Sequence, residues 1–490
     1  MKRKYLLLAS ATLVFAIIHS CKESTGKIII TEYEPFKAID MPSNLANGDA
    51  FPTDSTTIDV WLSNPNVDAQ GVQNDPNIIA HTWGLWQSLT EMTDQKFEGR
   101  RLRRFETWYT PQDVMKAMEL NIALADLKRN DGNLQFRKKF KFGHDNELNT
   151  AAGDISGKVK YSPSMAEHAL KEKYFDTVYL KSKIVVGEIN SLAFKPNDVM
   201  LKPIYRVLTD LSKAGKDMYY FDIWGGKQDG GKPNNKFSKV IKVITNLDSP
   251  MLETINDTLV YSIKNFIHHK MSEQEAYTYN HSTKEGFQFI DTAKVGDPII
   301  LLGMHASTRE TRRWTWQSFY WTENPNNPVF PSSKTIAAGR NSLELPAPLN
   351  NYAASIAYSM MSPALPFESK DGKAIDIVKA GVSPVYGLNP YIEGTFTEKD
   401  VFPNQNKLFK NADYEKQYYK GNVDGITSNC MSCHSQSYYD GTGTSGNFLA
   451  DQYVNRNAPW FKGAVQLDFA WSLSPRFELP PSKVTEPNKK

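Results

Sequence analysis

The sequence DPIILLGMHAST (residues 297–308), followed by RRWTWQSFYWTEN (residues 312–324), is the clearest guide to the fold class. Both runs combine β-branched and aromatic residues in the pattern that is typical of strands. Similar runs make the whole interval from about residue 178 to residue 345 β-rich, and they lie at residues 177–194, 218–225 and 239–247. We therefore expect strands to build the middle of the chain.

Helical patterns precede this interval. In residues 106–132, Thr110 is placed as an N-cap and Pro111 occupies the first helical position, both of which favour a helix start. Residues 161–175 repeat this arrangement, with Ser162 before a proline. Two helices are predicted here.

Two further helices are expected, at residues 78–92 and near residues 351–361. In the first, Trp83 and Trp86 are spaced i, i+3, which indicates a buried aromatic face. The fold class that follows is α+β, with a large mixed helix and β-rich body and a short, mostly helical C-terminal segment.

The N-terminus has the pattern of an export signal. Basic residues 2–4 precede an apolar run at residues 5–18, which is too short for a typical membrane span, and Ser20 and Cys21 follow. This pattern resembles the bacterial lipoprotein processing box, which implies cleavage before Cys21 and lipid on its thiol. An ordinary secretory signal with an unmodified Cys21 is the alternative.

The predicted organisation has four parts: a signal peptide (1–20), a tether (21–55), the mixed body (56–410) and the C-terminal segment (411–490). Cleavage of residues 1–20 removes three positive charges, so the formal net charge falls from +3 to about 0. A balanced charge without a clustered basic face argues against nucleic acid as a partner. We expect attachment to the membrane only through lipid at Cys21.

The remaining two cysteines stand together in GITSNCMSCHSQSYYD (residues 425–440). Cys430 and Cys433 are three positions apart, and His434 follows directly. Two thiols at this spacing can add to the two vinyl groups of a porphyrin, and the adjacent imidazole can bind its iron. We predict one covalent haem c per chain, held by Cys430 and Cys433, with His434 as the proximal iron ligand.

Three other kinds of site fit this motif less well. A thioredoxin-like pair needs a buried strand before it, whereas residues 420–429 are polar and turn-rich. A zinc site needs about four ligands, and no second cysteine pair is present in the sequence. A simple disulfide between Cys430 and Cys433 leaves His434 unexplained.

Several blocks resemble a family of large, mostly uncharacterised bacterial cytochrome c proteins. They span most of residues 81–473, and they are HTWGLW (81–86), ETWYTPQDV (106–114), FKPNDVMLKPIYRVL (194–208), LLGMHASTRETRRWTWQSFYW (301–321), NCMSCHSQS (429–437) and QLDFAWSL (466–473). The resemblance implies covalent haem and export, but it implies no substrate.

The sixth iron ligand is not evident from the motif. Residues 435–490 contain neither methionine nor histidine, so a protein ligand must come from upstream, or the position is open. His305 and Met304 are candidates, but they point to opposite faces if the strand continues. His81 is a further candidate.

Three functions remain open from the sequence. The first is electron transfer to a redox partner protein at the cell envelope, on the periplasmic side or at the surface of the outer membrane. The second is a haem enzyme or sensor with an open iron, peroxidase-like if His305 acts with Arg309 or Arg312. The third is a surface lipoprotein that binds glycans through Trp314, Trp316 and Trp321.

Overall fold

The computed structural model describes residues 36–129, 155–224, 239–246, 252–255, 258–281, 292–366, 375, 380–393, 428–442 and 453–473. These residues form a mixed α+β fold, as predicted. The expected signal peptide, Cys21 and residues 411–427 lie outside the described residues. The described residues that follow Pro35 belong to one compact unit.

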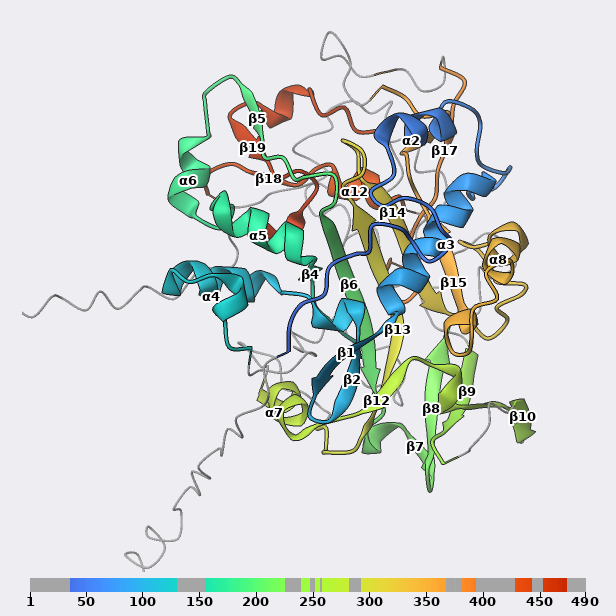
Figure 1. The fold of residues 1–490 in the computed structure, drawn as a ribbon. Coiled ribbons are helices and arrows are strands. Elements are labelled where there is room, and N and C mark those ends of the chain that lie inside the picture. The colour runs from blue at the N-terminus through green and yellow to red at the C-terminus, as the bar shows by residue number, and fades with distance from the viewer. Residues whose placement is uncertain are drawn as a thin grey trace, which may run out of the picture. The chain divides into compact units, whose positions relative to one another are not determined.

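An antiparallel sheet forms the centre of this unit (Figure 1). Its strands lie in the order β15 (Tyr352–Ile356), β14 (Thr315–Trp321), β13 (Pro298–Thr308), β6 (Val199–Val207) and β3 (Ile155–Gly157), while β12 (His268–Lys270) pairs with β13 and β4 (Lys160–Tyr161) with β6. Residues 297–308 and 312–324 are thus confirmed as strand-forming runs, which contain β13 and β14, and the structure shows that these two strands pair with each other.

Smaller sheets surround the central one. They are β10 (Leu252–Ile255), β11 (Thr258–Ser262), β9 (Lys239–Ile244), β8 (Met218–Ile223) and β7 (Lys213–Gly215); β18 (Tyr438–Tyr439), β19 (Ala464–Gln466) and β5 (Ile189–Ser191); β1 (Met92–Phe97) and β2 (Arg100–Arg103); and β16 (Met361–Ser362) and β17 (Ser383–Pro384). Since β19 pairs with β5 in parallel, the C-terminal segment shares a sheet with the body.

The α-helices of the described residues lie around the central sheet (Figure 1). They are α2 (Ser55–Leu62), α3 (Pro76–Thr90), α4 (Pro111–Leu120), α5 (Pro163–Lys171), α6 (Thr177–Ser182), α7 (Glu273–His281), α8 (Lys334–Asn341) and α12 (Cys430–His434). Within the described part of the chain, no helix is long and apolar enough to cross a membrane.

Helix α4 begins where its capping residues predict. The Thr110 hydroxyl oxygen accepts from the backbone N of Asp113 at 3.2 Å, and the Asp113 carboxylate accepts from the backbone N of Thr110 at 2.8 Å. The helix ends at Leu120 because Asn121 adopts a left-handed conformation with φ 51°. It is therefore shorter than the predicted helix at residues 106–132.

One predicted strand is a helix in the structure, and one predicted helix is a strand. Residues 177–182 form α6 rather than a strand, because the Asp176 carboxylate caps the backbone N–H groups of Val178 and Tyr179. The predicted helix near residues 351–361 is instead strand β15, whose side chains are all buried. Short apolar runs do not distinguish a buried strand from a helix.

The two faces of the central sheet are covered by different parts of the chain. Phe319 faces α3, where its ring lies 5.8 Å from that of Trp83 and 4.6 Å from that of Trp86, measured between ring centroids. The predicted aromatic face of α3 is thus confirmed as core. Trp316 points to the opposite face, because side chains alternate along a strand, and there it contacts the C-terminal segment.

The described part of the predicted tether packs on the body. Phe36, Leu45 and Phe51 are buried, so the packed body begins before residue 56. In the described part of the C-terminal segment, α12 is accompanied by short 3-10 turns at Pro459–Phe461 and Trp471–Leu473 and by strands β18 and β19. The mostly helical character expected there is therefore limited to short turns.

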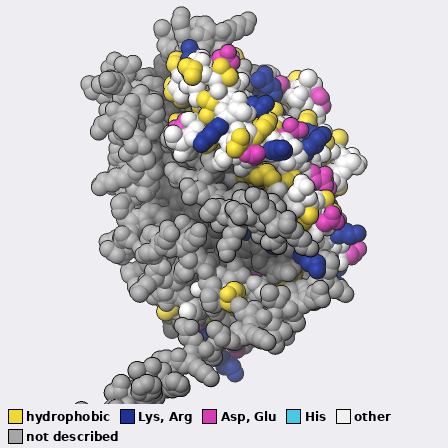
Figure 2. All heavy atoms as spheres, turned by 90° about the vertical axis from the view of Figure 1, so that its left-hand side faces the viewer, with side chains coloured by type: hydrophobic (Ala, Val, Ile, Leu, Met, Phe, Trp, Pro, Cys, Tyr) yellow, Lys and Arg dark blue, Asp and Glu magenta, His cyan; other side chains and the backbone are white. Residues whose placement is uncertain are grey.

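Figure 2 views the left-hand side of Figure 1. Basic, acidic and hydrophobic side chains are interspersed over the described part of this face. The exposed hydrophobic side chains of the chain include Val178 on α6, Val185 and Val186 just after it, and Trp460. The described surface in this view thus mixes both signs of charge with apolar side chains.

Candidate haem-binding site

Helix α12 is a single helical turn that starts at the buried side chain of Asn429. The Asn429 side-chain oxygen accepts from the backbone N of Ser432 at 3.0 Å and caps the turn. Its side-chain nitrogen donates to the carbonyl oxygens of Ser359 at 3.0 Å and Val385 at 2.6 Å. One side chain therefore both starts the turn and binds it to two segments of the body.

The three residues predicted to hold haem share one side of this turn. Cys430, Cys433 and His434 are half-buried, whereas Met431 and Ser432 are buried. The two cysteines are not joined by a disulfide. The thiol of Cys430 donates to the carbonyl oxygen of Gly387 at 2.9 Å. Two thiols and one imidazole on the same side of one turn are the donor set that covalent haem attachment requires.

His434 has a defined tautomer. Its Nδ1 lies 2.8 Å from the carbonyl oxygen of Phe469. A carbonyl oxygen only accepts, so Nδ1 donates and Nε2 keeps its lone pair. Metal-binding histidines commonly have this arrangement. Burial lowers the pKa of His434 to about 4, so the imidazole is neutral at pH 7 and able to bind a metal.

The backbone that presents the Phe469 carbonyl is unusual. Asp468 and Phe469 both have positive φ, 45° and 68°, which is rare for residues other than glycine. The Asp468 carboxylate accepts from the backbone N of Phe194 at 2.8 Å and from Nε of Arg309 at 2.9 Å. These bonds hold the strained turn in place. Arg309, a candidate distal residue from the sequence, therefore binds the C-terminal segment.

Trp316 of β14 supports the imidazole of His434. The two ring centroids are 4.4 Å apart, with an angle of 40° between the planes. Trp314 and Trp321 are also buried, so the tryptophans considered for glycan binding face the interior. No pattern in the sequence indicated that Trp316 would contact His434, because the two residues are far apart in the chain.

Two half-buried residues lie next to each other on the same face of the central sheet. His305 of β13 and Lys202 of β6 are direct cross-strand partners, and each is half-buried in a strand whose other residues are all buried. His305 shares its face with Ser307, which pairs with Trp316. His305 and Lys202 therefore point to the side that carries α12.

Glu393 lies against His305. Its Oε1 is 3.2 Å from Nε2 of His305, and its Oε2 accepts from the backbone N of Asn389 at 2.5 Å. Burial raises the pKa of Glu393, but His305, the Asn389 N–H and Lys202 together lower it below its ordinary value. Burial lowers the pKa of Lys202. These three residues also affect the pKa of His434: His305 and Lys202 lower it, and Glu393 raises it.

The turn that carries Glu393 lies directly on the sheet. The side-chain nitrogen of Asn389 donates to Oγ of Ser318 at 3.0 Å and to the carbonyl oxygen of Phe319 at 3.2 Å. Gly303 makes room for it, since a Cβ there would lie 2.5 Å from the Phe319 oxygen and 2.6 Å from Nδ2 of Asn389. A side chain at residue 303 would therefore displace the turn.

The other two candidates for the sixth ligand lie elsewhere. Met304 points away from His305, as its strand position predicts, and is buried in the core beneath α3. His81 is buried with Nδ1 2.6 Å from the hydroxyl of Tyr358 and Nε2 3.1 Å from Oε1 of Glu310. Among these three candidates, His305 is the one on the side that carries α12.

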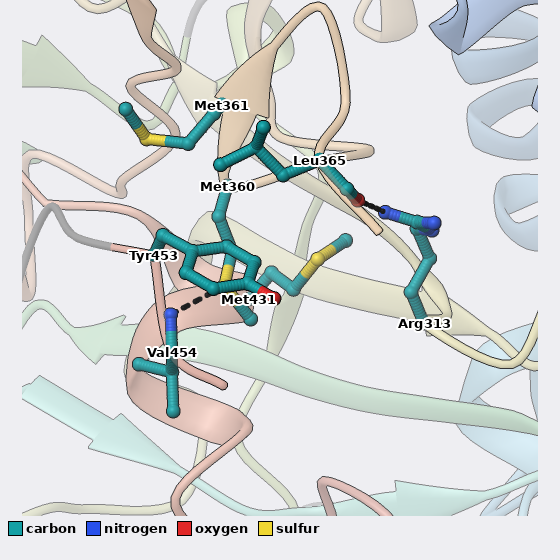
Figure 3. A pocket seen from close by; sticks show the side chains of 7 residues that line it. All are labelled: Arg313, Met360, Met361, Leu365, Met431, Tyr453 and Val454. Carbon is teal, nitrogen blue, oxygen red and sulfur yellow. Dashed lines mark hydrogen bonds between the residues drawn. The ribbon is translucent and has the colours of Figure 1, made fainter. Parts of the chain in front are cut away.

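A small cavity of about 10 Å³ adjoins the buried side of α12 (Figure 3). Figure 3 shows Met360, Met431 and Tyr453 gathered around it from three separate segments. The backbone N of Val454 donates to the sulfur of Met360 at 3.1 Å. A space of this size holds at most one water molecule, so these side chains anchor the turn and do not form a ligand site.

No group of three or more His, Cys, Asp or Glu side chains in the described residues is placed to hold a metal ion. Such a group is what a bare ion needs. A haem iron takes its equatorial ligands from the porphyrin and needs one or two protein side chains.

Comparison with known proteins returned no match: no family model, no curated protein and no solved structure is significantly similar to this chain. The resemblance to cytochrome c proteins therefore rests on the motifs quoted from the sequence, and the function is inferred from the site itself.

Proposed function

We propose that this protein is an exported, lipid-anchored c-type cytochrome that carries one covalent haem and transfers electrons at the cell envelope. The observation that supports this most directly is the geometry of α12. Cys430, Cys433 and His434 are half-buried on one side of the turn, and the bond from His434 to the Phe469 carbonyl leaves Nε2 with its lone pair.

Each residue of the site has a defined role in this proposal. Cys430 and Cys433 would bond to the haem, and Nε2 of His434 would bind its iron from one face. Trp316 and the Phe469 carbonyl would fix the imidazole in position. The haem itself would supply one-electron chemistry at the iron.

The remaining parts of the proposal come from the N-terminal sequence. Lipid at Cys21 would hold the protein at a membrane surface, on the periplasmic side or at the cell surface. Electron transfer also requires a redox partner protein.

A haem enzyme or sensor is a second candidate. The half-buried side chains of Lys202, His305 and Glu393 favour it, because polar groups beside an iron can stabilise a bound ligand. A glycan-binding lipoprotein has less support, since Trp314, Trp316 and Trp321 are buried.

Covalent haem can be tested directly. The full-length protein would be produced in a bacterium that has haem c maturation machinery, and the membrane fraction would be run on a denaturing gel and stained for haem. We expect haem to migrate with the protein. Visible spectra of the ferric and ferrous protein, with and without CO, would then separate the two candidates. Low-spin bands unchanged by CO support electron transfer, and a high-spin spectrum that shifts with CO supports the enzyme or sensor.

Two sets of variants provide the controls. Cys430→Ser combined with Cys433→Ser should abolish haem staining while the protein is still exported. Cys21→Ala should abolish lipid attachment and leave haem staining unchanged. If the wild-type protein is exported but carries no haem, the proposed function is wrong.

A further inference from the structure

His434 of α12 and His305 of β13 form hydrogen bonds through different ring nitrogens. In His434, Nδ1 is occupied by a carbonyl oxygen and Nε2 keeps its lone pair. In His305, Nε2 is the nitrogen that is occupied, by the Glu393 carboxylate at 3.2 Å. Nε2 is the nitrogen farther from the backbone and the usual one for reaching a metal. The carboxylate thus binds the atom that an iron would need.

Both partners of this pair are accessible. The side chain of His305 is 19% exposed and that of Glu393 is 16% exposed. An imidazole at a half-buried position can change its side-chain torsions at low cost, whereas residues in a fully packed core cannot. His305 therefore has the freedom to leave the carboxylate.

Glu393 itself is held more firmly. Its Oε2 accepts from the backbone N of Asn389 at 2.5 Å, and Asn389 is bound to Ser318 and Phe319 of the sheet. Lys202, the cross-strand partner of His305, also lowers the pKa of the Glu393 carboxyl group through its positive charge. If His305 moves, Glu393 keeps a hydrogen bond and a neighbouring positive charge, so its burial remains compensated.

We propose that Glu393 competes with the haem iron for Nε2 of His305, so that the sixth iron position exchanges between a protein-bound and an open form. In the open form Nε2 carries a proton, which it donates to the Glu393 carboxylate. In the protein-bound form that proton has moved to Nδ1 by exchange with solvent, and the Nε2 lone pair would bind the iron. This inference rests on the proposed function, because it requires haem on α12. The inference connects the two candidate functions. His305 would determine which fraction of the protein has a protein side chain on the sixth iron position and which fraction has that position open.

The test compares four variants, two of them at His305, with the wild-type protein. Glu393→Gln keeps the shape of the side chain but removes its charge, which weakens the bond to His305. His305→Ala removes the exchanging group, with His305→Asn as a second variant if the alanine protein does not fold. Glu323→Gln is the matched control, because Glu323 is a half-buried carboxylate that is paired with Lys239 instead.

The readouts are the low-spin fraction of the ferric visible spectrum and the rate of cyanide binding. We expect Glu393→Gln to raise the low-spin fraction and to slow cyanide binding roughly tenfold, since a charge-assisted hydrogen bond is about twice as strong as a neutral one. His305→Ala should be high-spin and bind cyanide faster than the wild type. Glu323→Gln should match the wild type.

Two results would overturn the inference. If His305→Ala and His305→Asn keep the wild-type low-spin fraction, His305 does not bind the iron. If Glu393→Gln lowers that fraction, the carboxylate supports ligation and does not compete with it. Haem staining of every sample separates this failure from a failure of covalent haem attachment, which would be shown by a wild-type protein that carries no haem.

Discussion

The imidazole of His434 lies against the indole of Trp316, with 4.4 Å between the ring centroids. The histidine belongs to α12 and the tryptophan to β14, so this contact joins the C-terminal segment to the central sheet. The surroundings of the proposed iron ligand are therefore determined in part by the body of the protein.

Replacing Trp316 should affect both stability and haem. Trp316→Leu removes a large buried side chain, and we expect it to lower the free energy of unfolding by about 2–4 kcal/mol. It should also broaden or shift the visible absorption bands of the haem protein, because the imidazole loses its support. Urea titration and visible spectroscopy measure the two effects.

Trp321→Leu is the matched control for this change. Trp321 is equally buried in the same strand, but it packs against Phe266, 4.4 Å away between ring centroids, on the other face of the sheet. Its replacement should cost a similar free energy and leave the absorption bands unchanged. Identical spectra for the two variants would show that Trp316 has no special relation to the haem.

Asn429 should contribute more to the free energy of unfolding than an ordinary N-cap does. Asn429→Ala removes the cap of α12 and leaves the carbonyl oxygens of Ser359 and Val385 without its donor. An N-cap contributes about 1 kcal/mol, and a buried group left without a partner costs about 1–3 kcal/mol. We expect urea titration to give a loss of about 2–4 kcal/mol in the free energy of unfolding.

Ser333→Ala provides the comparison. Ser333 caps α8 through one hydrogen bond, in which its hydroxyl oxygen accepts from the backbone N of Ile336 at 3.2 Å. Its loss should cost only about 1 kcal/mol. Equal losses for the two variants would mean that the additional bonds of Asn429 contribute nothing measurable.

Local patterns predicted much of the secondary structure. Thr110 and Pro111 correctly marked the start of α4, and Ser162 marked that of α5, because a cap depends only on residues within one turn. The strands β13 and β14 were also predicted, since their composition and length leave little ambiguity. The end of α4 was missed, because the left-handed conformation of Asn121 is not evident in a sequence without glycine there.

The surroundings of the site could not be predicted in the same way. The motif at residues 430–434 predicted the donor residues of a haem site, but Glu393 carries no local signal and reaches His305 only through the turn at Asn389. His168 is likewise buried, with Nδ1 3.0 Å from the Asp198 carboxylate, and no local pattern indicates this pair. Such pairs depend on long-range packing, which one sequence does not reveal.

Lys160 should make stability depend on pH. Its buried Nζ donates to the carbonyl oxygen of Glu106 at 2.8 Å, and burial lowers its pKa to about 7. Between this pKa and the pKa of about 10.4 in the unfolded chain, the unfolded state binds more protons than the folded state. The free energy of unfolding should therefore rise with pH from 7 to 10, by up to about 1.4 kcal/mol per pH unit from this residue.

Urea titrations at several pH values test this prediction. Lys160→Met should remove the contribution and flatten the profile between pH 7 and 10. Lys116→Gln, at an exposed position of α4, should leave the profile unchanged. If Lys160→Met has the slope of the wild type, Lys160 is not the group responsible.

Gly303 is the position where one methyl group should disturb both the fold and the site. In Gly303→Ala the new Cβ would lie 2.5 Å from the carbonyl oxygen of Phe319 and 2.6 Å from Nδ2 of Asn389, so the sheet or the Asn389 turn must move. Overpacking of this kind costs about 1–3 kcal/mol. Because the turn carries Glu393, the variant should also change the cyanide-binding rate of the haem protein. Gly215→Ala is the control, since its nearest neighbour would be 4.0 Å away, and it should alter neither quantity by much. A Gly303→Ala protein with the urea midpoint and cyanide rate of the wild type would show that the turn adapts without moving Glu393.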